Sequence, residues 1–269
     1  MNLVKKACLS FVTVTFFLSP LCAQDAALQR LNESPRHHEW VQIKQSDRTV
    51  HSFVVYPEVS GKATAVLVIH ENRGLTDWVR GLADQLAEAG YIAIAPDLLS
   101  GMGPEGGKTS DFADRNAARD ALYKISQEQI TADLNAVADY AKNLAAANGK
   151  IVVSGFCWGG SQTFRFATER KDLSAAFVFY GTGPDSNAIA AIHCPVYGFY
   201  GGNDNRVNAS IPEIEMQMKA AGKKYEPVVY EGAGHGFMRA GEQADASEAN
   251  KAGREAGWQR WMKILAKIK

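Results

Sequence analysis

Short apolar runs alternate with longer amphipathic segments along most of the chain. Two early segments, 40–43 and 52–56, alternate apolar and polar residues on either side of Asp47-Arg48, which predicts an antiparallel hairpin at the edge of a sheet. Near-continuous Val, Ile, Phe and Tyr in later runs is typical of strands buried on both faces. These runs cover residues 65–70, 91–95, 150–154, 175–180, 195–200 and 227–230.

The segments between the runs carry apolar residues at helical spacing. Three such stripes are Val79, Leu82 and Leu86; Leu134, Val137, Ala138, Ala141 and Leu144; and Trp258, Trp261, Met262, Leu265 and Ile268. Ser210 and Glu213 have the spacing of a capping box, so we expect a helix that runs towards Ala221 and ends at Gly222. Strands alternating with helices predict an α/β fold, with a mainly parallel sheet covered by helices on both faces. In such a sheet, ligands bind beyond the carboxyl ends of the strands.

Residues 98–129 do not follow this alternation. The segment begins with five glycine or proline residues between 101 and 107 and continues with a helix-like stretch over 112–125. A long excursion of this kind over the carboxyl edge predicts a partial lid or a pocket wall.

The first 23 residues have the pattern of a cleaved secretory signal. Lys5 and Lys6 precede an apolar stretch that is too short to span a bilayer, and Ala23 provides a small residue before Gln24. Cys22 could instead accept a lipid, although Leu21 is unfavourable before such a cysteine. We therefore expect a periplasmic or secreted protein, with residues 24–269 forming a single domain that has no membrane segment.

Charge and composition exclude several classes of partner. The chain has 29 basic and 29 acidic residues, and loss of the two signal lysines makes the net charge only slightly negative. Neither nucleic acid nor an anionic membrane is expected as a partner.

A Gly-x-Cys-x-Gly motif follows the run at 150–154. Cys157 lies between Gly155 and Gly159, and a helix containing Phe164 and Phe166 comes next. A nucleophile at such a strand-to-helix turn has a strained backbone, and the helix N-terminus stabilises negative charge beside it. The alternative is a buried structural cysteine in a glycine-rich turn.

A base and an acid follow Cys157 in the order expected for a triad. Asp204 comes after the run at 195–200, and His235 comes after the last run. Taken singly, these could be a turn residue and a surface histidine. Together they predict a Cys-Asp-His triad at one edge of the sheet.

Cys194, the other cysteine beyond the signal, precedes its strand, whereas Cys157 follows one. They should therefore lie at opposite edges of the sheet, too far apart for a disulfide or a shared metal. We expect Cys194 to be a small buried residue.

The motifs together resemble the dienelactone hydrolase (carboxymethylenebutenolidase) family. The resemblance is carried by residues 69–74 (IHENRG), 96–98 (PDL), 155–160 (GFCWGG), 201–204 (GGND) and 234–239 (GHGFMR). It implies an α/β-hydrolase fold and hydrolysis of a small ester or lactone, without a metal or organic cofactor.

The resemblance also assigns roles to single residues. The triad falls on Cys157, Asp204 and His235, and an additional carboxylate that contacts the resting thiol falls on Glu71. The oxyanion hole falls on the backbone N–H groups of Trp158 and Asn72. Two arginines that bind a substrate carboxylate fall on Arg239 and on either Arg115 or Arg119. Glu71 could otherwise be a surface acid, and Arg239 a surface arginine paired with Glu242.

Two other classes of function remain open. A binding protein could use a hydrolase scaffold without catalysis, although the intact Cys, Asp and His argue against this. A thiol redox protein would need a second cysteine near Cys157, which the chain does not offer.

Overall fold

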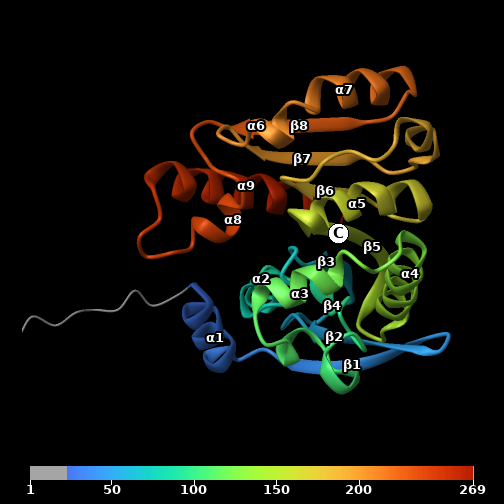
Figure 1. Ribbon diagram of the computed structural model, residues 1–269, viewed down its shortest axis with the longest axis vertical. Coiled ribbons are helices and arrows are strands. Elements are labelled where there is room, and N and C mark those ends of the chain that lie inside the picture. Colours follow the sequence, from blue (N-terminus) through green and yellow to red (C-terminus); the bar gives the residue numbers. More distant parts are fainter. Residues whose placement is uncertain (1–22, 269) are drawn as a thin grey trace, which may run out of the picture.

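The computed structural model of the protein describes residues 23–268 (Figure 1). The expected signal peptide, 1–23, therefore lies outside the described residues except for Ala23. Within the described part, no helix has the length and apolar character needed to cross a membrane.

One eight-stranded sheet forms the centre of the molecule, in the order β1-β2-β4-β3-β5-β6-β7-β8. β1 and β2 form the predicted hairpin and β2 pairs antiparallel with β4, whereas all other neighbours are parallel. The fold is that of an α/β-hydrolase, as predicted. The strands are β1 (His38–Gln45), β2 (Arg48–Val55), β3 (Ala63–Ile69), β4 (Ile92–Pro96), β5 (Ala147–Phe156), β6 (Ala176–Phe179), β7 (Val196–Gly201) and β8 (Tyr225–Tyr230).

Each face of the sheet has its own apolar core, because the central strands bury both faces. In β3, for example, Leu67 and Ile69 belong to one core, whereas Val66 and Val68 belong to the other. The first core is closed by α3 (Arg115–Leu122), α4 (Gln127–Asn143), α5 (Trp158–Glu169) and α7 (Ile211–Ala220). The second is closed by α1 (Ala23–Glu33), α2 (Asp77–Glu88), α8 (Phe237–Ala240) and α9 (Glu248–Leu265). The apolar runs of the sequence thus predicted the layers correctly.

The remaining elements are short. They are α6 (Asn205–Asn208) and the 3-10 turns η1 (Pro104–Gly106), η2 (Thr109–Asp111) and η3 (Ser186–Ala191). Of the excursion after β4, only α3 is a regular α-helix, and it is shorter than the predicted helical stretch over 112–125.

Two local expectations were incomplete or wrong. Helix α1 was not predicted, because its buried contact consists of little more than Ala27 and Leu31. The capping box at Ser210 does not form: its backbone is helical, with φ −87° and ψ −14°, and its hydroxyl donates to the Val207 carbonyl at 2.8 Å. The cause is α6, which runs almost directly into α7 and holds Ser210 in a helical conformation. The predicted end is correct, with Gly222 at φ +66°.

Candidate active site

Cys157 lies at a sharp turn between β5 and α5. Its backbone φ of 57° lies in a region that residues other than glycine rarely adopt. The flanking glycines are required by close packing: a Cβ at Gly155 would lie 2.2 Å from the Gly159 carbonyl oxygen, and one at Gly159 would lie 2.3 Å from that of His70. This geometry matches the predicted nucleophile turn and leaves Cys157 partly exposed at the N-terminus of α5.

The loops after β7 and β8 bring Asp204 and His235 together. Asn203 donates its backbone N–H to the Ala233 carbonyl at 2.9 Å and its side-chain amide to the Gly232 carbonyl at 2.9 Å. These bonds hold the two loops side by side. His235 Nδ1 lies 2.5 Å from Asp204 Oδ2, and Asp204 is only 6% exposed.

His235 is also hydrogen-bonded to Cys157. Since Nδ1 faces Asp204, the sulfur engages Nε2. The bond to Cys157 is the main cause that raises the pKa of His235 to about 9; burial opposes it and the bond to Asp204 adds to it. The raised pKa favours the protonated imidazole, which lies between the Asp204 carboxylate and the Cys157 sulfur.

Glu71 lies beside Cys157 because β3 and β5 pair with Ile69 opposite Gly155. Glu71 is only 7% exposed, and its carboxylate accepts a hydrogen bond from Arg239 Nε at 2.8 Å. Its contact with a resting thiol stays a prediction. The alternative pairing of Arg239 with Glu242 is wrong, because Glu242 instead accepts hydrogen bonds from Arg254, Trp78 and Gln85.

The two predicted oxyanion donors come from adjacent turns. Trp158 is the first residue of α5, so its N–H has no acceptor within the helix. Asn72 lies in the turn directly after Glu71. Both turns follow strands that are neighbours in the sheet, so the two N–H groups are positioned at the same edge as Cys157.

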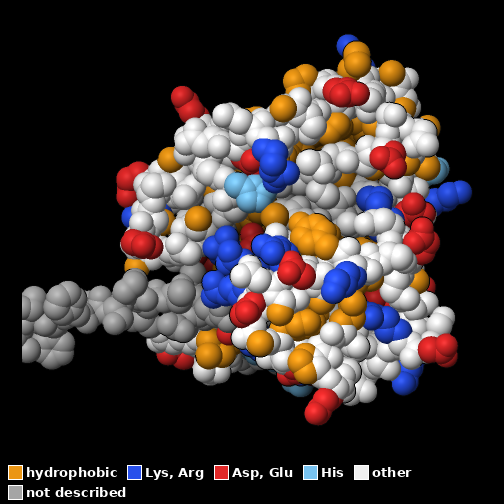
Figure 2. Space-filling model, in the orientation of Figure 1, with side chains coloured by type: hydrophobic (Ala, Val, Ile, Leu, Met, Phe, Trp, Pro, Cys, Tyr) orange, Lys and Arg blue, Asp and Glu red, His pale blue; other side chains and the backbone are white. Residues whose placement is uncertain are grey.

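The two candidate arginines of the excursion have different environments in the structure. Arg115 lines a pocket of about 480 Å³, whereas Arg119 is not among its lining residues and donates to Asp120 at 2.9 and 3.0 Å. Figure 2 shows Lys and Arg side chains gathered near a histidine in the middle of one face, over the region of α2 and α3. The site edge is thus electropositive on the side of the excursion.

Comparison with known proteins identifies the family. Residues 50–269 match the model of the dienelactone hydrolase family. The chain belongs to this family. It is therefore a hydrolase of the carboxymethylenebutenolidase type, which acts on esters or lactones.

Individual relatives match most of the length of this chain. A protein of Escherichia coli K12 named "Putative carboxymethylenebutenolidase" is 33% identical over 215 residues, which is 75% of this chain and 76% of the relative. One of the same name from Salmonella typhimurium is 31% identical over 229 residues, 80% and 82% of the two chains. Among solved structures, "Putative Dienelactone Hydrolase" from Klebsiella pneumoniae is 26% identical, with a TM-score of 0.75 over 86% of this chain and 98% of its own.

His70 was missed as a positioning residue by the sequence analysis, which treated it only as part of a motif. It is fully buried, and its Nδ1 lies 2.7 Å from the Glu71 carbonyl while Leu98 N–H donates to Nε2 at 3.3 Å. Nε2 is thus the acceptor, and Nδ1 carries the proton. The ring stacks on Trp158 with centroids 5.7 Å apart, so His70 links both oxyanion turns to the loop after β4.

Tyr180 was also missed. It follows β6 with φ 39°, and its ring packs edge-on against His235 at 5.1 Å. Its buried hydroxyl makes no hydrogen bond within the described residues. Burial is the main cause that raises the pKa of Tyr180, and the charges of Glu71 and Cys157 add to it. Its single signal in the sequence was its place directly after a strand.

Proposed function

We propose that the protein hydrolyses small carboxylic esters or lactones through a Cys157-His235-Asp204 triad and an acyl-enzyme. The observation that carries this proposal is the chain of hydrogen bonds from Asp204 through His235 to Cys157 at the strained turn. The thiolate is the reactive form of cysteine, and the imidazole of His235 is placed to take the proton of the thiol.

In the first half-reaction, the Cys157 thiolate attacks the substrate carbonyl carbon. The carbonyl oxygen becomes an oxyanion, which the N–H groups of Trp158 and Asn72 stabilise. The oxyanion collapses, the bond to the leaving alkoxide breaks, and His235 gives its proton to that oxygen. The products are an alcohol and a thioester on Cys157; for a lactone, both remain in one molecule.

In the second half-reaction, neutral His235 takes a proton from water as the water oxygen attacks the thioester carbonyl. Collapse of the new oxyanion breaks the carbon–sulfur bond and releases the acid. The thiolate and the imidazolium are restored. Asp204 keeps the imidazole oriented with Nε2 towards the reaction.

We also propose that the substrate can carry a carboxylate. A relative from Bradyrhizobium, 25% identical over 212 residues, is named "Probable 2-oxo-3-(5-oxofuran-2-ylidene)propanoate lactonase", which names an anionic lactone. The ion pair of Arg239 with Glu71 uses Nε, so its terminal nitrogens can face such a group. Arg115 is the better placed of the two excursion arginines, since it lines the pocket.

The nucleophile is tested by mixing the enzyme with 4-nitrophenyl acetate. We expect a burst of 4-nitrophenol equal to the enzyme concentration, followed by slower turnover. Mass spectrometry of the quenched enzyme should find the acetyl group on Cys157. Cys157→Ala should lose the burst and at least about a thousandfold in kcat/KM. Full activity in this variant would contradict the proposal.

Export with removal of residues 1–23 is proposed as well. Intact-mass measurement of the protein from the producing cell should give a chain that begins at Gln24. A retained N-terminus, or a lipid on Cys22, would contradict it.

A further inference from the structure

Residues 235–242 form one segment that begins with His235 and ends with Glu242. The short helix α8 lies between these two residues, and Arg239 belongs to it. Backbone bonds close the segment from Gly236 onwards, among them the bond from Glu242 N–H to the Arg239 carbonyl at 3.3 Å. Because these bonds hold the segment in one shape, contacts made by Glu242 also influence where His235 lies.

The Glu242 carboxylate is the centre of a hydrogen-bond cluster that joins the 235–242 segment to α2 and α9. Its Oε2 accepts the indole N–H of Trp78 at 2.9 Å, and its Oε1 accepts from Gln85 Nε2 at 3.0 Å; both donors belong to α2. Arg254 of α9 donates to Oε1 from a terminal nitrogen at 2.9 Å and from Nε at 3.3 Å. The side chains of Arg254 and Glu242 are only 17% and 23% exposed, so this ion pair is better shielded from water than a surface pair.

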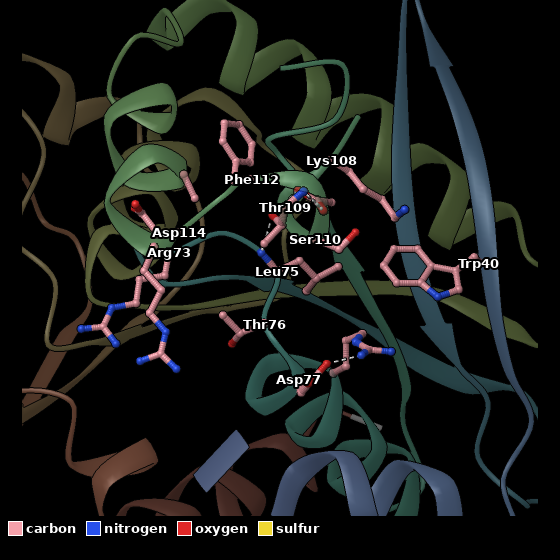
Figure 3. Close-up of a pocket in the computed structure, with 14 residues that line it drawn as sticks. Trp40, Arg73, Leu75, Thr76, Asp77, Lys108, Thr109, Ser110, Phe112 and Asp114 are labelled. Atoms are coloured by element: carbon pink, nitrogen blue, oxygen red, sulfur yellow. Dashed lines mark hydrogen bonds and ion pairs between the residues drawn. The ribbon is translucent and has the colours of Figure 1, made fainter. Parts of the chain in front are cut away.

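Helix α2 continues directly from the turn that holds the expected oxyanion residue Asn72. Figure 3 shows this connection, in which the chain from Arg73 to Asp77 leads into the helix. Trp78 is the second residue of α2, is 2% exposed, and packs edge-on against Phe156 with ring centres 5.2 Å apart. Phe156 directly precedes Cys157. The donor that holds Glu242 is thus itself packed against the nucleophile turn.

Helix α9 anchors the same segment at both of its ends. Asn250 Oδ1 accepts the backbone N–H of Gly234, the residue before His235, at 2.9 Å. Arg254 lies one helical turn further along α9 and holds Glu242 at the other end. The segment is therefore fastened to α9 on one side and, through Glu242, to α2 on the other.

A second link between the segment and the turn after β3 is the ion pair of Arg239 with Glu71. The Arg239 side chain is 30% exposed, and it lies where a substrate carboxylate is proposed to bind. Such a carboxylate would compete with Glu71 for the arginine. The cluster around Glu242 uses no group of the proposed mechanism, so its bonds stay in place while substrate is bound.

We propose that Glu242 is a positioning residue for acyl transfer. Through Trp78 and Arg254 it holds the 235–242 segment at a fixed distance from the turn after β3. It thereby keeps the base His235 aligned with the oxyanion donor Asn72. A displacement of about 1 Å between such groups can cost about a hundredfold in rate. This inference rests on the proposed function, which gives His235 and Asn72 their roles.

The first test measures kcat/KM for 4-nitrophenyl acetate, which reports acylation alone in a two-step acyl transfer. Glu242→Ala should lower kcat/KM by roughly ten- to a hundredfold per folded enzyme, with the folded fraction taken from urea unfolding. Glu242→Gln should lose less, about three- to tenfold, because its amide oxygen still accepts the Trp78 N–H but carries no charge for Arg254.

The second test separates positioning from a merely structural role. The bond to Cys157 is the main cause that raises the pKa of His235 to about 9. If the segment shifts, this bond weakens, so the pKa of His235 should fall in Glu242→Ala, and the alkaline limb of kcat/KM should move to lower pH with it. A smaller folded fraction alone would leave both unchanged. NMR titration of the His235 ring measures the pKa without turnover.

Trp78→Phe serves where Glu242→Ala does not fold. It removes a single N–H donor, keeps an aromatic ring against Phe156, and should lower kcat/KM by about three- to tenfold. Asp172→Asn is the matched control, because Asp172 also accepts hydrogen bonds from two cations, Lys142 at 2.6 Å and Arg170 at 2.7 Å. It precedes β6, at the opposite edge of the sheet, and its substitution should leave kcat/KM within about twofold.

The outcomes distinguish this inference from the proposed function. An acetyl group found on a residue other than Cys157 defeats the proposed function, and the NMR titration of His235 then still tests the role of Glu242. An unchanged pKa of His235, or a kcat/KM that falls only in proportion to the folded fraction, overturns the inference and leaves hydrolysis by Cys157 standing.

Discussion

The molecule contains two buried aspartates that each hold a histidine, one near the N-terminal hairpin and one in the candidate site. Asp84 lies on α2 and is fully buried, and its Oδ1 lies 2.9 Å from His38 Nε2. Asp204 lies after β7 and is 2.5 Å from His235 Nδ1. The two pairs look alike in isolation, so what surrounds each pair decides what it does.

Asp84 is enclosed by donors. Arg36 contributes two hydrogen bonds of 2.7 and 2.8 Å, and the Ser34 hydroxyl adds one of 2.6 Å. Burial raises the pKa of Asp84, but the hydrogen bonds from Arg36, Ser34 and His38 outweigh it and lower the pKa to about 2. The cluster fastens the segment after α1 to α2, and its one hydroxyl, that of Ser34, donates to Asp84.

Asp204 has fewer partners and a more exposed histidine. The His235 side chain is 35% exposed, and its second nitrogen meets Cys157 rather than a structural group. Under the proposed mechanism, the contrast teaches that an aspartate–histidine pair can act in catalysis only where the histidine is left open to a nucleophile and to substrate. At Asp84, the two hydrogen bonds from Arg36 make the pair a structural contact between two segments.

The largest expected effect is on kcat, which should fall on substitution of Asp204 but not of Asp84. Asp204→Asn should lower kcat by about a thousand- to ten-thousandfold, because the amide favours the wrong imidazole tautomer, while the circular dichroism spectrum stays unchanged. Asp84→Asn, assayed at a temperature where it is folded, should keep kcat within about twofold. Comparable losses in both variants would remove the distinction.

Stability should respond in the opposite way. Asp84→Asn removes the charge that balances the nearly buried Arg36 and should lower the free energy of unfolding by about 3 kcal/mol. Urea unfolding followed by tryptophan fluorescence measures this. Asp204→Asn, whose partner is open to water, should cost less than half as much. An unaltered urea midpoint in Asp84→Asn would mean that the cluster does not fasten the N-terminal segment.

The pH dependence of activity sharpens the comparison further. The pKa of His235 is raised, so the imidazolium is present below about pH 9 and is lost above it. We therefore expect kcat/KM for a neutral ester to fall as the pH rises through about 9. In Asp204→Asn this limb should move to lower pH, because one of the bonds that raises the pKa is weakened. An identical limb in both proteins would assign it to another group.

The smallest expected effect is the loss of folding stability at acidic pH. The pKa of Asp84 is lowered from 3.8 to about 2, so its contribution to stability is complete above pH 4 and is lost as the pH falls towards 2. The loss should amount to about 2 kcal/mol. Urea midpoints at pH 5, 4, 3 and 2 measure it, with Asp84→Asn as the control that lacks this part of the slope. Parallel curves for the two proteins would show that other carboxylates dominate.

Much of the site was predictable because its residues follow strands. Cys157, Asp204 and His235 each come directly after an apolar run, and parallel strands bring such positions to one edge. Within residues 23–268 the two cysteines, Cys157 and Cys194, are free, and Cys194 is buried on the amino side of β7, as expected from the same argument. Burial raises the pKa of Cys194 to about 12, which keeps it unreactive.

Other features had at most a weak signal in the sequence. Helix α1 buries too few apolar residues to form a recognisable stripe. His70 and Tyr180 act through contacts with Trp158 and His235 that arise only when several loops meet. Serine at position 210 is a residue type that commonly caps helices. However, α6 holds the backbone of Ser210 in a helical conformation, and its hydroxyl donates to the Val207 carbonyl.

The sequence by itself determined the layers and the strand ends, and with them the order in which Cys157, Asp204 and His235 follow their strands, because these depend on which residues must be buried. The tertiary structure decided which polar groups pair. Glu71 and Arg239 are 168 residues apart, and nothing in their local sequence distinguishes this ion pair from one between Arg239 and Glu242. Hydrogen bonds depend on distances of tenths of an ångström between side chains from different elements. Those distances are fixed only after the sheet and its helices have packed.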